Sequence, residues 1–191
     1  MITTVERIFS CGIDYRSRSA RVYAFMKRAV LFHLSFLLVL VSGCTKKIEV
    51  TSLQRKEAAA LVSEAEFAIT IRDFPRAETL MQQAVKLCPD NGSYALSLGN
   101  ILVKTGKKPE AKKVFSSALQ AYQAAYKADP TDGSLLMRQM YVQALLGQGD
   151  EARKLLRKAK DKHPKNSEVS GFSENALEQM LADPGFKAMA L

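Results

Sequence analysis

The chain has 191 residues, of which 47% are hydrophobic and 25% are charged, proportions that are typical of a soluble globular protein. These values exclude a wholly disordered chain and a polytopic membrane protein, and the part beyond residue 43 is long enough for one ordinary domain. The formal charge of +9 divides into +4 for residues 1–43 and +5 for residues 44–191. A domain with a net charge of +5 needs no nucleic-acid partner to explain it.

Residues 26–43 have the order of parts that an export signal peptide has. Lys27 and Arg28 supply a positively charged start, residues 29–41 are almost entirely apolar, and small residues then precede Cys44. An apolar stretch of this length is shorter than the roughly 20 residues that a membrane-spanning helix needs, but it suits a signal peptide. We therefore interpret residues 26–43 as a signal peptide.

The chain before Met26 does not fit this interpretation. Signal peptides begin with a short charged segment, and residues 1–28 would make an unusually long one. We therefore interpret residues 1–25 as a misassigned upstream extension, with a genuine long leader as the alternative.

The four residues Val41-Ser42-Gly43-Cys44 resemble the lipobox of bacterial lipoproteins. This resemblance implies that a diacylglycerol is joined to the sulfur of Cys44, that the chain is cleaved before this residue, and that the freed amine is usually acylated as well. Because Thr45 rather than Asp follows, the resemblance favours attachment to the outer membrane, facing the periplasm, with residues 44–52 as a tether. The alternatives are a secretory signal with a chance cysteine and an uncleaved anchor.

The rest of the chain repeats with a period of 34 residues. This spacing separates four pairs of identical residues, namely Pro75 and Pro109, Ala77 and Ala111, Ala84 and Ala118, and Pro130 and Pro164. A fixed period of 34 is typical of the tetratricopeptide repeat, a helix–turn–helix unit. The chain resembles this family over residues 58–166, which implies an all-α solenoid of about three repeats with a C-terminal capping helix.

The predicted repeat region covers residues 53–166, divided into repeats at about 58–91, 92–132 and 133–166. Ala111 and its counterpart Ala152 are 41 residues apart, seven more than the period. Seven residues are nearly two helical turns, so we assign them to a long helix over residues 108–128. Gly106 and Gly147 suit helix ends, where a left-handed backbone is needed.

The family places a small residue where the two helices of a unit approach most closely. Ala65 and Gly99 fit this pattern, whereas Met140 departs from it and could splay the third pair. Residues 167–191 are predicted to cap the array, because a terminal repeat cannot cover its own apolar face. Within this cap, a final short helix from Pro184 would pack back through Phe186 and Met189, and folding onto a partner is the alternative role.

The sequence shows no recognisable set of residues for catalysis, for a metal ion or for a cofactor. The cysteines Cys11, Cys44 and Cys88 are far apart, and His163 is the only histidine beyond the predicted signal peptide. The segment Gly147-Gln148-Gly149 follows a predicted helix rather than a strand, so it lacks the context of a dinucleotide-binding loop. We expect no enzyme activity, no cofactor, no metal, no nucleic-acid partner and no small-molecule substrate.

In tetratricopeptide repeats the first helix of each unit lines a concave groove, and the resemblance implies the same role for matching positions here. Those expected to bind a partner protein or peptide are Leu96, Asn100, Lys104, Met137 and Tyr141. Their amide and ammonium groups can bind backbone or carboxylate groups, and the thioether and phenol add adaptable apolar area. A related clamp for acidic C-termini needs Lys and Asn in the first unit. Val62 and Glu66 occupy those positions, so this specificity is not expected.

Together, these features predict a lipoprotein of the bacterial cell envelope, anchored to the membrane by its N-terminal lipid. The chain would act as a protein–protein interaction module or scaffold in an envelope assembly, a step that depends on analogy between folds. One alternative is a stable accessory subunit of a pilus, secretion or outer-membrane assembly complex. An envelope enzyme is the other.

Overall fold

Residues 49–191 are the part of the chain that the computed structural model describes. The predicted upstream extension, the signal peptide and Cys44 lie outside this part, as does much of the predicted tether. Among the described helices, none is both long enough and apolar enough to cross a membrane.

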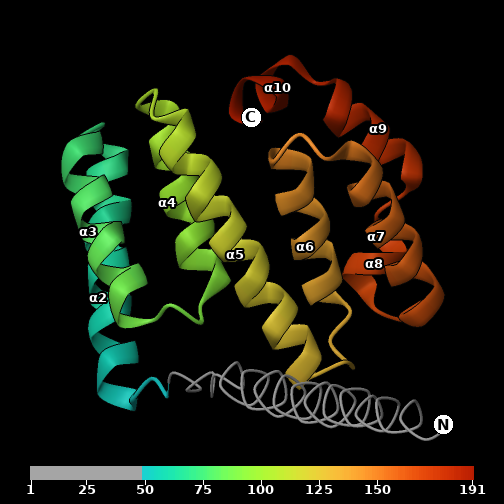
Figure 1. Ribbon diagram of the computed structural model, residues 1–191, viewed down its shortest axis with the longest axis horizontal. Helices are drawn as coiled ribbons and strands as arrows, with labels where there is room; N and C mark the ends of the chain where they lie inside the picture. Colours follow the sequence, from blue (N-terminus) through green and yellow to red (C-terminus); the bar gives the residue numbers. More distant parts are fainter. Residues whose placement is uncertain (1–48) are drawn as a thin grey trace, which may run out of the picture. The chain divides into compact units, whose positions relative to one another are not determined.

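The described residues form nine helices and contain no strand (Figure 1). They are α2 (Ser52–Thr70), α3 (Phe74–Leu87), α4 (Gly92–Lys104), α5 (Lys108–Ala128), α6 (Ser134–Leu145), α7 (Gly149–Lys162), α8 (Ser167–Gly171), α9 (Glu174–Ala182) and α10 (Pro184–Met189). The first six form three hairpins, α2 with α3, α4 with α5 and α6 with α7. Successive hairpins stack α3 on α4 and α5 on α6. This arrangement confirms the predicted all-α solenoid of helix pairs.

The turn inside each hairpin places one residue in the left-handed region. These residues are Arg72, Gly106 and Gly147, with φ angles of 61°, 80° and 74°. The amide of the residue that follows each of these three donates a hydrogen bond to the carbonyl five residues before it, at 2.8 to 2.9 Å. This bond closes the end of the first helix. The two glycines were predicted at these ends, whereas Arg72 adopts the same backbone at a cost of about 1–2 kcal/mol.

Each hairpin buries one residue of its first helix and one of its second helix at matching positions. They are Ala65 and Met81, Gly99 and Phe115, and Met140 and Leu156. The helices approach closely in the second hairpin, where a Cβ added to Gly99 would lie 2.3 Å from the Phe115 ring. In the third hairpin Met140 is only 3% exposed, and it lies in one cluster with Leu156, which takes the position that Phe115 has in the second hairpin. The large residue that departs from the family pattern is therefore accommodated in the core.

The long second helix is confirmed, since α5 has the predicted bounds Lys108–Ala128. Its buried stripe continues to Tyr122, which is 4% exposed. The carbonyl of Tyr122 accepts a hydrogen bond from Nε2 of Gln139 at 3.3 Å. The side-chain hydroxyl of Tyr122 lies 3.1 Å from Oγ of Ser93. The added turns therefore tie α5 to both α4 and α6, so the extension joins the second repeat to the third.

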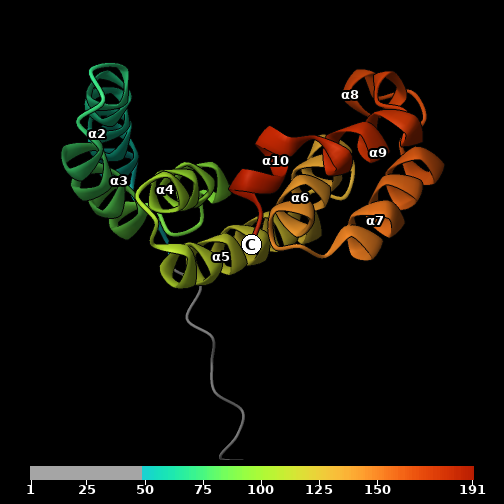
Figure 2. The ribbon, with the colours of Figure 1, turned by 90° about the horizontal axis from the view of Figure 1, so that it is seen from above.

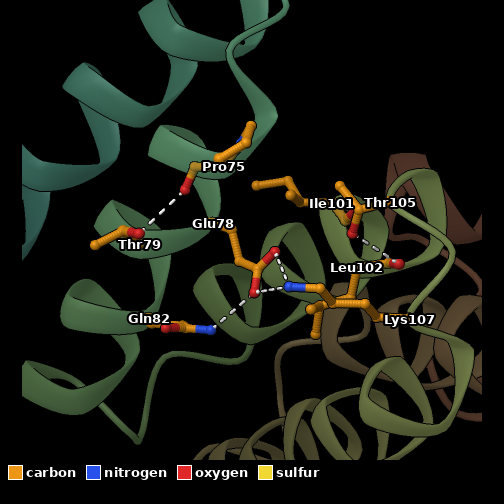
Figure 3. Close-up of polar contacts among 8 residues, drawn as sticks. All are labelled: Pro75, Glu78, Thr79, Gln82, Ile101, Leu102, Thr105 and Lys107. Carbon is orange, nitrogen blue, oxygen red and sulfur yellow. Dashed lines mark hydrogen bonds and ion pairs between the residues drawn. The ribbon is translucent and has the colours of Figure 1, made fainter.

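The first two repeats are joined by a half-buried ion pair (Figure 3). Nζ of Lys107 donates to Oε1 and Oε2 of Glu78 at 2.8 and 2.9 Å, and Nε2 of Gln82 donates to Oε1 at 3.2 Å. The hydrogen bond to Glu78 raises the pKa of Lys107 above its ordinary value. A raised pKa means that this contact stabilises the fold at neutral pH, and that its contribution is lost only as the pH rises through the raised pKa.

Candidate partner-binding site

The five predicted partner-binding residues come from two neighbouring first helices, α4 and α6. Figure 2 shows these helices on one side of the array and α5 on the other. Leu96, Asn100 and Lys104 lie on α4, whereas Met137 and Tyr141 lie on α6. They are considered as two groups, the three on α4 and the two on α6.

An open pocket of about 210 Å³ adjoins the first group. It is lined by Ile69, Phe74, Ser97, Asn100, Ile101 and Lys104, which come from α2, α3 and α4. Oδ1 of Asn100 is buried and has no hydrogen-bond partner in the described part of the chain. Nζ of Lys104 lies 5.9 Å from the centre of the Phe74 ring, within the range of a cation–π contact. The pocket therefore combines an amide and a cation with an apolar wall.

The second group is contacted by the chain's own C-terminal segment. The ring of Tyr141 packs edge-to-face on Phe186 of α10, with 5.8 Å between the ring centroids. Met137 is half-buried and packs against the cluster that contains Met140, Leu156 and Leu177. Leu96, of the first group, is half-buried against the main core, the cluster that includes Leu98, Phe115 and Leu145. Three of the five side chains thus already have apolar partners within the chain.

The cap is fixed to the last repeat through α9. Leu177 of α9 is 1% exposed and packs with Met140 and Leu156. Nε and Nη2 of Arg153 donate to the two carboxylate oxygens of Glu178 at 2.6 and 2.8 Å. This hydrogen bonding lowers the pKa of Glu178 from its ordinary value. The stabilisation from this pair is therefore present above the ordinary pKa of glutamate and is lost as the pH falls through the lowered pKa.

Two side chains with reactive groups, those of Cys88 and His163, make contacts within the fold. Cys88 is buried, its Sγ lies 3.7 Å from the Gln54 carbonyl oxygen, and burial raises the pKa of the thiol. Nε2 of His163 lies 3.1 Å from the hydroxyl of Tyr126. Within residues 49–191, no group of three or more His, Cys, Asp or Glu side chains is arranged to hold a metal ion.

Comparison with known proteins gives matches to one family. Two family models, each described as tetratricopeptide repeat, match residues 63–119 and residues 115–176. No curated protein matches the chain.

Similar solved structures share little sequence with the chain. The first tetratricopeptide repeat domain of Spaghetti (RPAP3), bound to the HSP90 peptide SRMEEVD, is 16% identical, with a TM-score of 0.43 over 71% of this chain and 99% of that one. The Arabidopsis OM64 domain is 17% identical, with a TM-score of 0.41 over 67% and 96%. MamA MSR-1 C2 is 20% identical, with a TM-score of 0.37 over 69% and 74%.

The two family matches follow one another along the chain and include most of the three helix hairpins. The family's helix–turn–helix unit is the unit that these hairpins repeat. Residues 63–176 therefore belong to the tetratricopeptide repeat family, whose members serve as protein–protein interaction modules.

Proposed function

We propose that the chain is a lipid-anchored interaction module that holds a protein partner in a bacterial envelope assembly. The lipid on Cys44 and the attachment to the outer membrane are supported by the sequence of the signal peptide and lipobox alone. Partner binding is supported by the tetratricopeptide repeats and by the open pocket between α2, α3 and α4. In this proposal the anchor sets where the module works, and the pocket sets what it binds.

The observation that carries the binding proposal is the open pocket that Asn100 and Lys104 line together with apolar side chains. An asparagine amide carries both donor and acceptor atoms, so it can pair with the main chain of a bound peptide. Lys104 adds a cation for a carboxylate, and Ile69 and Phe74 add apolar area on the same wall. The pocket therefore fits a peptide segment that combines an unpaired backbone group with an acidic and an apolar side chain.

Replacing Asn100 and Lys104 together with alanine is expected to weaken partner capture at least about tenfold, because interface energy concentrates in a few residues worth about 2 kcal/mol each. Capture is measured as the amount of partner retained by the tagged full chain from the cells that produce it. Both side chains lie at the pocket rather than in the core, so the thermal unfolding midpoint should stay nearly unchanged.

A matched control removes one amide and one ammonium group from elsewhere. Lys112→Ala with Gln123→Ala does this at exposed positions of α5. This control should capture the partner as the unaltered chain does. Equal capture by the pocket variant and the control would contradict the assignment of the pocket.

A further inference from the structure

The last helix packs on α9 of the cap and also turns back into the array. After α9, which packs on α7, the chain reverses at Asp183, and α10 returns toward α4 and α6 (Figures 1 and 2). The Asp183 side chain accepts a hydrogen bond from the Phe186 amide at 2.7 Å, which begins α10. The chain thus places its own end against the first helices of the second and third repeats, which also carry the predicted partner-binding residues.

The last two residues are held by main-chain contacts. The amide of Leu191 donates to the carbonyl of Leu145 at 2.9 Å, and Nζ of Lys108 donates to the carbonyl of Ala190 at 3.1 Å. A Cβ added to Gly147 would lie 2.7 Å from the Leu191 oxygen, so the chain end fits closely against this turn. These contacts recognise a backbone of any sequence.

Side chains supply the selectivity. Phe186 packs on Tyr141, and Met189 and Leu191 pack against the main core, as does Phe186 itself. The three side chains are spaced at the first, fourth and sixth positions of one short segment. All three remain half-buried, and Lys187 and Ala188 between them are exposed. The site therefore selects an aromatic residue followed by two apolar residues.

The segment has little stability apart from this site. α10 has six residues, and an isolated helix of that length is unstable in water. The half-buried side chains also give up less apolar area on leaving than fully buried ones would. The segment therefore depends on its contacts with α9 and with this surface to stay folded.

We propose that the surface between α4 and α6 is a peptide-binding site that the chain's own residues 184–191 occupy. Its external ligand is a peptide with an aromatic residue followed by apolar residues three and five positions later. This deepens the proposed function, since it adds a second, self-covered region to the same groove, formed in part by Tyr141. Residues 184–191 thus reduce the apparent affinity for that ligand.

The test uses a fluorescent synthetic peptide of residues 184–191 as the probe. The full chain carrying Phe186→Ala and Leu191→Ala should bind it at least about tenfold more tightly than the unaltered full chain, as expected if the native tail occupies the site about 90% of the time. A second variant, in which the chain ends at Asp183, should show the same gain. A peptide with alanine at the Phe186 and Leu191 positions is the control and should bind to neither.

Three outcomes would overturn the inference. One is equal peptide binding by the unaltered and tail-weakened chains. Another is a large fall in the unfolding midpoint of both variants with no gain in binding, which would make the segment a structural cap. The third is a dimer that forms only when the tail is intact, which would place the tail in a second copy.

Failure of the proposed function and failure of this inference give different experimental results. If the pocket variant Asn100→Ala with Lys104→Ala captures its partner normally while the tail-weakened chain gains peptide binding, the pocket assignment fails and this inference stands. If the pocket variant loses its partner and the tail variants gain no peptide binding, the pocket assignment stands and this inference fails.

Discussion

Methionine in place of Gly99 is expected to destabilise the protein by about 3 kcal/mol, the upper part of the range for overpacked cores. Even a Cβ at this position would lie 2.3 Å from Cε1 and 2.5 Å from Cδ1 of Phe115, and Phe115 is fully buried. Neither helix can withdraw without opening the second hairpin, which lies in the middle of the array. Thermal unfolding followed by circular dichroism should show a midpoint about 10 °C lower.

A second substitution should restore part of the stability that Gly99→Met removes. Phe115→Leu, added to Gly99→Met, gives these positions the residues that Met140 and Leu156 supply in the third hairpin, and should recover part of the lost stability. Phe115→Leu removes three of the four side-chain heavy atoms that Gly99→Met adds, so the sizes at the two positions again complement each other. Phe115→Leu alone serves as the control and should destabilise, because it leaves a cavity beside Gly99. A double variant no more stable than Gly99→Met alone would contradict the proposed complementarity.

Replacing Cys44 with serine is expected to abolish membrane attachment. Serine lacks the thiol that the predicted diacylglycerol modification needs, so neither lipid is added. Two or more acyl chains anchor a protein stably, whereas none leaves it without an anchor. The variant should move from the membrane pellet to the soluble fraction, and mass spectrometry of the unaltered protein should show the added lipid mass.

The control for the anchor is Cys88→Ala. Cys88 is buried within the array, so its replacement should leave both the lipid mass and the membrane fraction unchanged. Recovery of the Cys44→Ser protein in the membrane pellet, with the same mass as the unaltered protein, would show that the anchor is of another kind.

The repeats could be predicted because their physical signals are local. Pro75 and Pro109 recur at the period of one unit, and Gly106 marks a helix end where a left-handed backbone is needed. The long α5 followed from counting the seven surplus residues. Arg72 could not be predicted, since no glycine marks the first turn and its conformation is imposed by the hairpin that it closes.

The candidate site was predictable only in part. The resemblance to tetratricopeptide repeats identified α4 and α6 as first helices, and its groove positions pointed to Asn100 and Tyr141. It could not show that Asn100 adjoins an open pocket while Tyr141 is covered by Phe186. That difference depends on the path of the chain after Asp183, which is fixed by contacts between residues far apart in sequence. Local periodicity carries no information on such contacts.

Site-specific photocrosslinking tests the claim of partner binding most directly. A photoreactive residue would be placed at position 104 beside the pocket, or at position 112 on exposed α5, in the full chain within the cells that produce it. The account predicts a discrete crosslinked species of higher mass from position 104 that is absent from position 112. A crosslink from position 112 with none from position 104 would contradict it.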